Sequence, residues 1–238
     1  MSKPFKFKAF EVHQAGASMK VGTDGVLLGA WTPTTGDQHI LDIGTGTGLI
    51  ALMLAQRNPK ASITAIDIHE PSVNLALYNF SRSTFTNPMI ALEASLQEYS
   101  KMAKLKFDLI VSNPPFFTSG TKASVKARQE ARHNTALPFE VLIEQAGNLL
   151  TAQGLFTVVL PFEASNSFVE LAFEHGLYLN KWTKVKSKES KPFERSLFCF
   201  GLQKVTPMED ELVLNHEQGR NNWTSAYKTL TSNFYTII

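Results

Sequence analysis

The sequence contains one cysteine among 238 residues. A single cysteine excludes a disulfide framework within the chain and a cysteine-rich zinc site. Cys199 follows Leu197 and Phe198 and precedes Phe200, so we expect its thiol to lie in the hydrophobic core. We expect no metal site.

Long apolar runs are missing as well. No run approaches the roughly 20 residues that a membrane-spanning helix needs, so we expect no membrane partner. The basic N-terminal segment 1–8 has neither an apolar core nor a cleavage site, which predicts no secretory signal and a cytoplasmic location. The length suits one α/β domain. We predict a single domain over 1–238, with an N-terminal arm and capping segment at 1–36 and the core at 37–238.

A strong overall charge is also missing, because the net charge is +2. The charge is nevertheless unevenly distributed. Residues 11–100 carry four Lys and Arg against eight Asp and Glu, whereas residues 101–204 carry fourteen against nine. A basic half can bind a polyanion, or its lysines can simply be solvated. Both interpretations remain open at this point.

What the sequence does have is a glycine loop, Asp42-Ile-Gly-Thr-Gly-Thr-Gly48. An apolar run precedes it at 38–41, and a segment with helical spacing follows at 49–55, which predicts a strand, a turn and a helix. Glycine allows a sharp turn and lets a ligand lie against the backbone. The helix directs unpaired N–H groups toward that ligand.

A second acidic residue follows the loop at a suitable distance. Residues 61–66 predict the next strand, and Asp67 stands at its carboxyl end, where a carboxylate can accept hydrogen bonds from both ribose hydroxyls of a nucleoside. Asp67 can also simply begin a helix, since Pro71 follows. Behind a glycine loop, the ribose interpretation is favoured.

The spacing Asp-x-Gly-x-Gly-x-Gly resembles the first motif of class I methyltransferases that use S-adenosylmethionine. In the nicotinamide fingerprint the third glycine comes one residue later. The alternatives to an S-adenosylmethionine site are a nicotinamide site and a turn without a ligand. The resemblance implies that the loop approaches the methionine part of the cofactor and that the acidic residue before it organises the ammonium side. The residues concerned are Asp42, Gly44, Gly46 and Gly48.

The same resemblance implies further cofactor contacts. An acidic residue after the third strand usually accepts from the adenine amino group; here Ser95 takes that place, with Glu93 as the alternative. The segment that begins at Thr23 and Asp24 is similar to one that lies near the methionine end in amino-directed methyltransferases. From the sequence alone, Thr23 or Asp24 can cap a short helix that contains Val26.

The alternation of strands and helices predicts an α/β fold, a doubly wound, mostly parallel seven-stranded sheet of Rossmann-like type. Two extended runs within 177–203 predict an antiparallel hairpin at its edge. Ligands bind beyond the carboxyl ends of such strands. Asp42, Asp67, Ser95 and Asn113 all follow predicted strands, and we expect them to meet at one rim.

The fourth of these strands ends in Asn113-Pro-Pro-Phe116. Two prolines fix the backbone and remove two N–H groups, so the carbonyl of Pro114 and the side-chain oxygen of Asn113 can accept from one planar amino group. Phe116 can stack on that group. Adenine N6, guanine N2 and a glutamine amide all satisfy this arrangement. The structural alternative is a rigid turn.

The N-terminal arm alternates lysine and phenylalanine: Lys3, Phe5, Lys6, Phe7, Lys8 and Phe10. This pattern is typical of a short edge strand with one buried face. It also suits RNA bases that stack on aromatic rings between cations. We favour the strand.

Over nearly its whole length, the chain resembles the bacterial tRNA1(Val) adenine-37 N6-methyltransferases. The resemblance rests on segments 7–10 and 19–31, the glycine loop, Asn-Pro-Pro-Phe-Phe117, Arg132-His-Asn134 and the segment 227–235. It implies methyl transfer from S-adenosylmethionine to an adenine in a tRNA anticodon loop, with Asn113, Pro114 and Phe116 as catalytic residues and Asn113 also at the cofactor. Basic residues at 181–195 and in a long polar segment are candidates for RNA phosphates, the latter being Lys122, Lys126, Arg128 and Arg132.

Two alternatives remain. The first is methylation of another planar amine, such as guanine N2 of RNA or a protein glutamine amide. Against the glutamine amide, Phe116 replaces the tyrosine common in the glutamine-directed branch, and we expect no additional N-terminal helical domain. The second is a non-catalytic RNA-binding module. The intact Asn113-Pro-Pro-Phe116 argues against that module.

Overall fold

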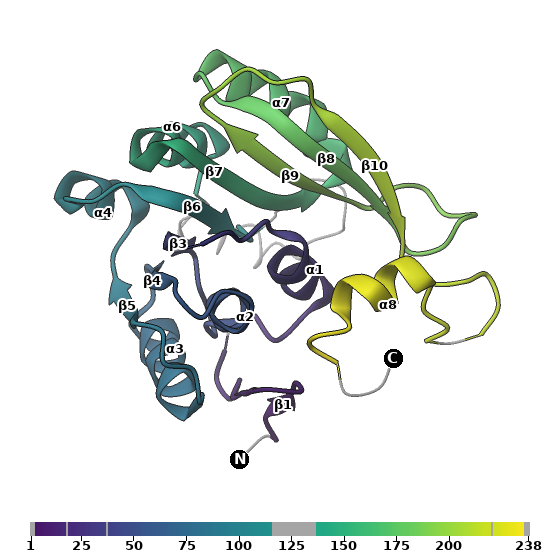
Figure 1. Cartoon of the computed structure of the whole chain (residues 1–238), viewed down its shortest axis with the longest axis horizontal. Helices are drawn as coiled ribbons and strands as arrows, with labels where there is room; N and C mark the ends of the chain where they lie inside the picture. Colours follow the sequence, from purple (N-terminus) through teal and green to yellow (C-terminus); the bar gives the residue numbers. More distant parts are fainter. Residues whose placement is uncertain (1–2, 18, 37, 116–136, 220, 236–238) are drawn as a thin grey trace, which may run out of the picture.

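The computed structural model describes residues 3–17, 19–36, 38–115, 137–219 and 221–235. Its centre is an eight-stranded sheet in the order β10-β8-β9-β7-β6-β3-β4-β5 (Figure 1). The strands are β3 His39–Ile43, β4 Ser62–Asp67, β5 Met89–Glu93, β6 Phe107–Ser112, β7 Leu150–Pro161, β8 Tyr178–Lys186, β9 Arg195–Gly201 and β10 Met208–Val213. The predicted fold class is confirmed, with eight strands in place of the expected seven.

The central strands β7-β6-β3-β4-β5 are parallel. The predicted hairpin is present, because β9 pairs antiparallel with both β7 and β8. It does not form the edge of the sheet. The additional strand β10 lies outside it and pairs in parallel with β8, Met208 opposite Lys181.

Helices cover both faces of the sheet, because the side chains of β3 alternate between two cores. Ile40 belongs to the core under α1 Thr23–Trp31, α2 Leu49–Arg57 and α3 Glu70–Arg82. Leu41 belongs to the core under α4, α6 and α7. This period of two, with both faces buried, is typical of a central parallel strand. The remaining helices are α4 Leu96–Met102, α6 Phe139–Leu149, the 3-10 turn η1 Phe162–Ala164, α7 Ser165–Glu174 and α8 Ser225–Thr231.

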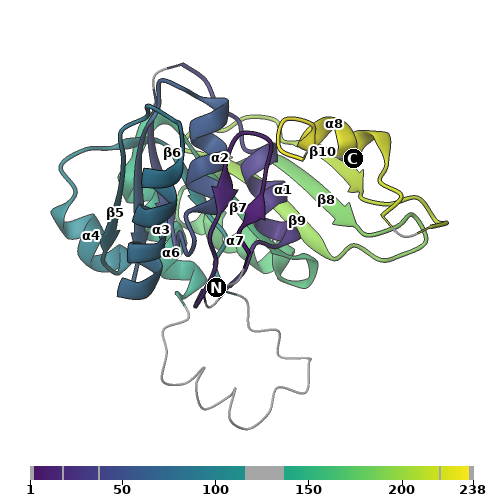
Figure 2. The ribbon, with the colours of Figure 1, turned by 90° about the horizontal axis from the view of Figure 1, so that it is seen from below.

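The N-terminal arm forms a separate two-stranded sheet, in which β1 Phe5–Lys6 pairs with β2 Glu11–Val12 (Figure 2). Phe7 and Phe10 stack with their ring centroids 4.7 Å apart, and both are buried. The predicted buried face is therefore confirmed, although the strand does not join the main sheet. Because these two rings are buried, they cannot stack on RNA bases.

The arm meets the other end of the described chain. The Phe7 ring stacks on Tyr235 at 5.8 Å, and the Lys8 N–H donates to the Phe234 carbonyl at 2.8 Å. Trp223 and Tyr227, whose ring centroids are 4.6 Å apart, continue the aromatic layer toward α8. The two ends of the chain therefore close one side of the core.

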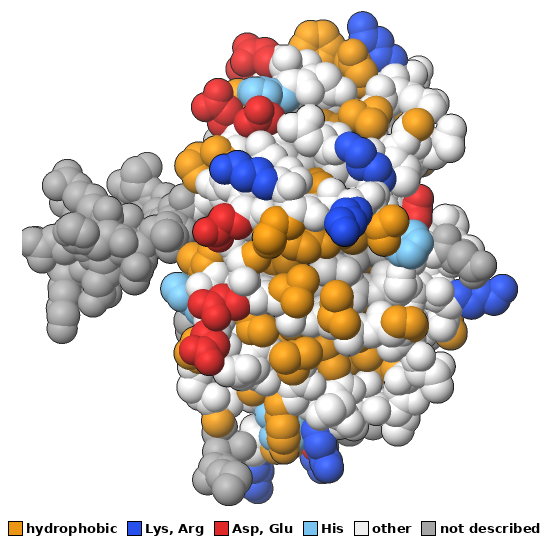
Figure 3. Space-filling view, turned by 90° about the vertical axis from the view of Figure 1, so that its left-hand side faces the viewer, with side chains coloured by type: hydrophobic (Ala, Val, Ile, Leu, Met, Phe, Trp, Pro, Cys, Tyr) orange, Lys and Arg blue, Asp and Glu red, His pale blue; other side chains and the backbone are white. Residues whose placement is uncertain are grey.

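The edge strand of the main sheet at the end opposite β10 is β5. Exposed apolar side chains from β5 and from α3 lie there: Leu77, Tyr78, Ile90 and Leu92. Figure 3, which views the molecule from the side of α3, α4 and β5, shows hydrophobic side chains spread across the surface. As predicted, Cys199 is buried in β9, where burial raises the pKa of its thiol to about 12. No helix among the described residues is long and apolar enough to cross a membrane.

Candidate active site

The glycine loop joins β3 to α2, and its three glycines serve two purposes. All three have positive φ, which L residues rarely adopt: +72° at Gly44, +55° at Gly46 and +78° at Gly48. A Cβ atom on Gly44 or Gly46 would meet no described atom within 4 Å. On Gly48 it would lie 2.6 Å from the Phe80 ring. The first two glycines thus leave an open cradle, whereas the third lets α2 pack against α3.

Asp42 lies beneath this cradle and is 1% exposed. Its Oδ2 accepts a hydrogen bond from the Thr45 hydroxyl at 2.7 Å, while Oδ1 makes no hydrogen bond of normal geometry with the described residues. Burial raises the pKa of Asp42 to about 7, against the smaller opposing effects of Thr45 and the Ala51 N–H. A buried acceptor of this kind is available to a donor from a ligand.

Asp67 holds the loop in place from the end of β4. Its Oδ2 accepts from the Gly46 N–H at 2.9 Å, and its Oδ1 accepts from the His69 N–H at 3.0 Å. The second bond supports the turn into α3, although Asp67 itself ends β4 and His69 occupies the N-cap position of α3. Each carboxylate oxygen has a second lone pair. The ribose contact therefore stays a prediction that this geometry permits.

Ser95 begins α4, and its hydroxyl already has partners. It accepts from the Glu98 N–H at 3.2 Å and donates to Glu98 Oε2 at 2.7 Å. The Ser95 N–H donates to the same Oε2 at 3.1 Å, which completes a capping box. These bonds lower the pKa of Glu98. Glu93 is exposed and lies opposite Asp67 in the β4–β5 register. Ser95 and Glu93 both remain predictions for the adenine contact, with the carboxylate of Glu93 the more accessible.

Asn113 and Pro114 follow β6 directly. The Ser112 hydroxyl donates to the Ile43 carbonyl at 3.0 Å and so holds the ends of β6 and β3 together. Asn113 Oδ1 is buried without a hydrogen-bond partner among the described residues, and its Nδ2 lies 4.0 Å from the Met19 sulfur. Pro114 is buried. Phe116, the third predicted catalytic residue, lies outside the described residues.

The first turn of α1 packs beside Asn113. A Cβ atom on Gly25 would lie 3.9 Å from Asn113 Nδ2. The prediction that Thr23 or Asp24 caps this helix is wrong, because Gly22 occupies the N-cap position and no side-chain cap is present in this described turn. Asp24 instead accepts from Arg195 Nε of β9 at 2.8 Å. Sequence reasoning missed Arg195, since 171 residues separate the partners.

Comparison with known proteins identifies the family. A family model, the methyltransferase small domain, matches residues 20–181. The chain is 44% identical to the tRNA1(Val) (adenine(37)-N6)-methyltransferase of Flavobacterium psychrophilum over 97% of this chain and 98% of that protein. The Escherichia coli O157:H7 protein of the same name is 38% identical over 98% and 95%. The chain belongs to this methyltransferase family. The predicted family is thereby confirmed.

Solved structures agree on the fold of the methyltransferase. A predicted O-methyltransferase from Agrobacterium tumefaciens superposes with a TM-score of 0.70 at 16% identity, over 89% of this chain and 96% of that one. A methyltransferase from Pyrococcus furiosus gives 0.54 at 21% identity, over 78% and 89%. At such identities the likeness shows the fold alone, which is the Rossmann-like fold expected from the sequence.

In the methyltransferase, three of the four predicted rim residues meet as expected. The fourth, Ser95, is the N-cap residue of α4. Ile43, next to Asp42, pairs with Ile66 of β4 and with Ser112 of β6, so neighbouring strands end at the same level. Asp42, Asp67 and Asn113 thus share one rim. The predicted RNA-binding residues Lys122, Lys126, Arg128 and Arg132 lie outside the described residues.

In the second predicted basic surface, at 181–195, most cations have acidic partners, and its contact with RNA phosphates stays a prediction. The lysines of β8 face the acidic strand β10. The ion pairs are Lys181–Asp210 at 3.0 Å, Lys184–Glu209 at 2.9 Å, and Lys186 with Glu189 at 2.8 Å and Glu211 at 3.4 Å. Arg195 is paired with Asp24. The charge balance of this segment therefore changes once β10 is in place.

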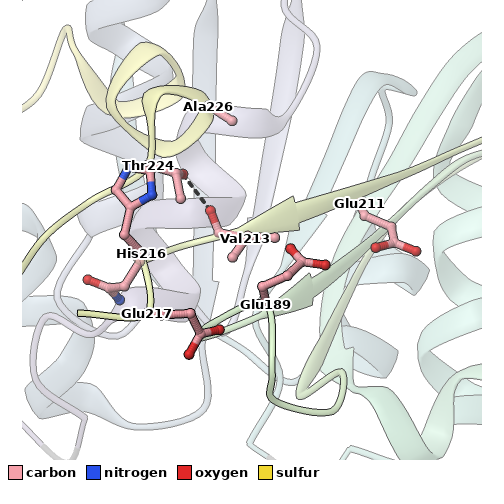
Figure 4. A pocket seen from close by; sticks show the side chains of 8 residues that line it. Glu189, Glu211, Val213, His216, Glu217, Thr224 and Ala226 are labelled. Carbon is pink, nitrogen blue, oxygen red and sulfur yellow. Dashed lines mark hydrogen bonds between the residues drawn. The ribbon is translucent and has the colours of Figure 1, made fainter.

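The hollow beside this segment is acidic. A pocket of about 440 Å³ lies between the β8–β9 loop, the end of β10 and α8. Figure 4 shows Glu189, Glu211 and Glu217 around it, together with His216. None of its described lining residues belongs to the glycine loop or to the Asn113 turn. This pocket is therefore separate from the rim of the methyltransferase.

Proposed function

We propose that this methyltransferase transfers a methyl group from S-adenosylmethionine to N6 of adenine 37 in the anticodon loop of tRNA1(Val). Membership of a family whose curated members carry that name, at up to 44% identity over nearly the full length, carries the proposal. The acceptor atom of Asn113 at the rim supplies the chemical reason.

The rim suits S-adenosylmethionine. The cradle at Gly44 and Gly46 is open where any other residue would place a Cβ atom, and the buried Oδ1 of Asp42 is available to a donor. We assign Asp67 to the ribose hydroxyls, Ser95 or Glu93 to adenine, and the first turn of α1, with Thr23 and Asp24, to the methionine end. When bound, the cofactor supplies an electrophilic sulfonium methyl group.

Asn113 and Pro114 position the amine. The exocyclic nitrogen of adenine is a poor nucleophile because its lone pair is delocalised into the ring. Two acceptors, Asn113 Oδ1 and the Pro114 carbonyl, bind its hydrogens and favour a pyramidal nitrogen with a localised lone pair. Alignment then supplies much of the rate, and the amine proton leaves for solvent after attack. Phe116 is assigned to stacking on the adenine ring.

Lys122, Lys126, Arg128 and Arg132 are assigned to the phosphates of the anticodon loop. Unstacked loop bases are accessible to a protein, unlike those of an RNA helix. We further propose that residues 1–238 act as one methyltransferase domain and that the protein works in the cytoplasm, where tRNA is modified.

The test is transfer of labelled methyl groups by the purified protein to unmodified tRNA transcripts, followed by nucleoside digestion and mass spectrometry. We expect N6-methyladenosine from the tRNA1(Val) transcript and none from the same transcript with guanine at position 37. Label in another nucleoside would redirect the activity to another planar amine of RNA. Absence of label from every RNA would overturn the tRNA assignment and favour a protein glutamine amide.

A further inference from the structure

A second pocket lies beside the first turn of α1, on the side opposite to the one that faces Asn113. It has a volume of about 390 Å³ and is lined by segment 21–23 and by four aromatic residues, Phe5, Trp223, Tyr227 and Tyr235. We call it the aromatic pocket. Its volume falls within the range of small-molecule sites, about 300–1,000 Å³.

The walls of the aromatic pocket come from both ends of the chain. Trp223 and Tyr227 form one ring pair, with centroids 4.6 Å apart, and Phe5 and Tyr235 form an edge-on pair at 6.4 Å. Phe5, Trp223 and Tyr235 are half-buried, so part of each ring remains accessible. Rings held in place but partly open are the usual platform for an unstacked nucleobase.

The surroundings of the aromatic pocket carry the charge that RNA requires. Among the described residues within three positions of its lining residues along the chain, five are cations and one, Asp24, is acidic. That carboxylate is paired with Arg195 at 2.8 Å. The cations are Lys3, Lys6, Lys8, Lys20 and Lys228, all exposed. These neighbours of the lining residues along the chain are the cations that we assign to phosphates beside a base in the pocket.

The aromatic pocket lies close to the reacting end of the site. Thr23 lines the pocket, and two residues further along the same helical turn Gly25 faces Asn113. A helix with its side chains is about 10 Å across. A base in the pocket and an adenine at Asn113 would thus lie on opposite sides of one helical turn, which neighbouring nucleotides of an opened loop can span.

We propose that the aromatic pocket binds a nucleobase of the substrate RNA that flanks the methylated adenine. The proposal rests on the function proposed above, and it adds a second base-binding site that fixes the position of the loop. Trp223 is the principal platform, and the Tyr235 hydroxyl, which lies beside that of Tyr227, supplies a polar contact.

The test is a double-mutant cycle on binding. The dissociation constant of full-length tRNA1(Val) transcripts is measured for wild type and for Trp223→Ala. Each transcript carries one abasic site at a position from 34 to 40, other than 37. We expect Trp223→Ala to weaken binding of the intact transcript by about tenfold, the usual order for one stacked base. For the wild type, one of the abasic sites should weaken binding by the same factor as Trp223→Ala does. In Trp223→Ala, that abasic site should weaken binding no further.

Controls separate stacking from misfolding. Trp223→Phe keeps an aromatic face and should retain most of the affinity, while Phe173→Ala removes a ring that is 60% exposed on α7 and should change nothing. The abasic series on wild type does not depend on whether a variant folds. Additive losses, or no abasic effect in wild type, would overturn the proposal. So would a loss of cofactor affinity in Trp223→Ala with RNA binding intact.

Failure of this proposal and failure of the proposed function give different results. If wild type methylates adenine 37 but the cycle shows no coupling, only the aromatic pocket is wrongly assigned. If wild type binds the transcript with the expected coupling but transfers no methyl group to it, the pocket stands and the assigned reaction is wrong.

Discussion

The rim at the ends of β3, β4 and β6 and the edge formed by β8 and β10 use polar groups in opposite ways. The rim has few charges, yet two of its buried oxygens, Asp42 Oδ1 and Asn113 Oδ1, have no partner among the described residues. The edge has many charges, yet three of its lysines are paired with acidic side chains. Two others, on Gln56 and Asn180, lie outside the rim. Buried acceptors without a partner therefore mark the binding site only where they gather at one rim, as those of Asp42 and Asn113 do.

The sharpest test of this difference compares two asparagines. Asn113 and Asn180 both have a buried side-chain oxygen without a partner among the described residues, but only Asn113 lies at the rim. We expect Asn113→Ala to lower kcat for methyl transfer by about 10²–10³-fold, as loss of a positioned polar group does. Cofactor affinity should change less. Asn180→Ala should leave kcat unchanged; equal effects of the two substitutions would contradict the assignment.

Within the glycine loop, two substitutions distinguish a glycine that lets two helices pack from a glycine that leaves space for the ligand. Gly48→Ala should lower the free energy of unfolding by about 2–5 kcal/mol, because it combines a left-handed φ with a clash against Phe80. Gly46→Ala should cost only about 1–2 kcal/mol. It should nevertheless weaken cofactor binding by about tenfold or more, since about 1.4 kcal/mol of steric cost is tenfold in affinity. Denaturant titration and calorimetric cofactor binding measure the two effects.

The buried carboxyl group at the rim predicts a pH dependence. Because the folded pKa of Asp42, about 7, lies above its ordinary 3.8, the folded state binds more protons between pH 4 and 7. Its contribution to stability is thus fully present below pH 4 and is lost as the pH rises to 7, by at most about 1.4 kcal/mol per pH unit. The difference in the free energy of unfolding between wild type and Asp42→Asn, measured by denaturant titration across this pH range, should show this slope. Parallel curves for the two proteins would refute it.

The smallest expected effect is on tRNA affinity, for which we compare two sets of basic residues. Replacement of Lys122, Lys126 and Arg128 by alanine should weaken tRNA binding by about tenfold and reduce its salt dependence, with a change in slope of about 0.7–0.9 for each lost phosphate contact. Replacement of Lys181 and Lys184 by alanine should change neither, because these lysines are paired with β10. A larger effect of the second pair would make the edge an RNA surface after all.

Much of the fold was predictable because local patterns agree with it. Apolar runs that end in Asp42, Asp67 and Asn113 mark three neighbouring parallel strands, and the glycine loop fixes the first turn. The strand β10 was not placed in the sheet, because three of its six residues are acidic and exposed. Its register is set by β8, from which it is separated along the chain by β9.

The site was predictable to the same degree. The three rim residues follow from strand ends, whereas Arg195 reaches Asp24 only through the fold. The capping box at Ser95 was readable, since Ser-x-x-Glu before a helix is its usual sequence pattern. The interpretation of Ser95 as an adenine contact passed over that pattern.

The contact between Phe7 and Tyr235 has a consequence for biosynthesis. As the ribosome delivers the chain from its N-terminus, the arm emerges long before the segment around Tyr235 that receives it. The glycine loop and its strands can form while translation continues. The aromatic layer cannot close until the segment around Tyr235 leaves the exit tunnel, so the nascent enzyme completes this side of the molecule after the strands of the glycine loop.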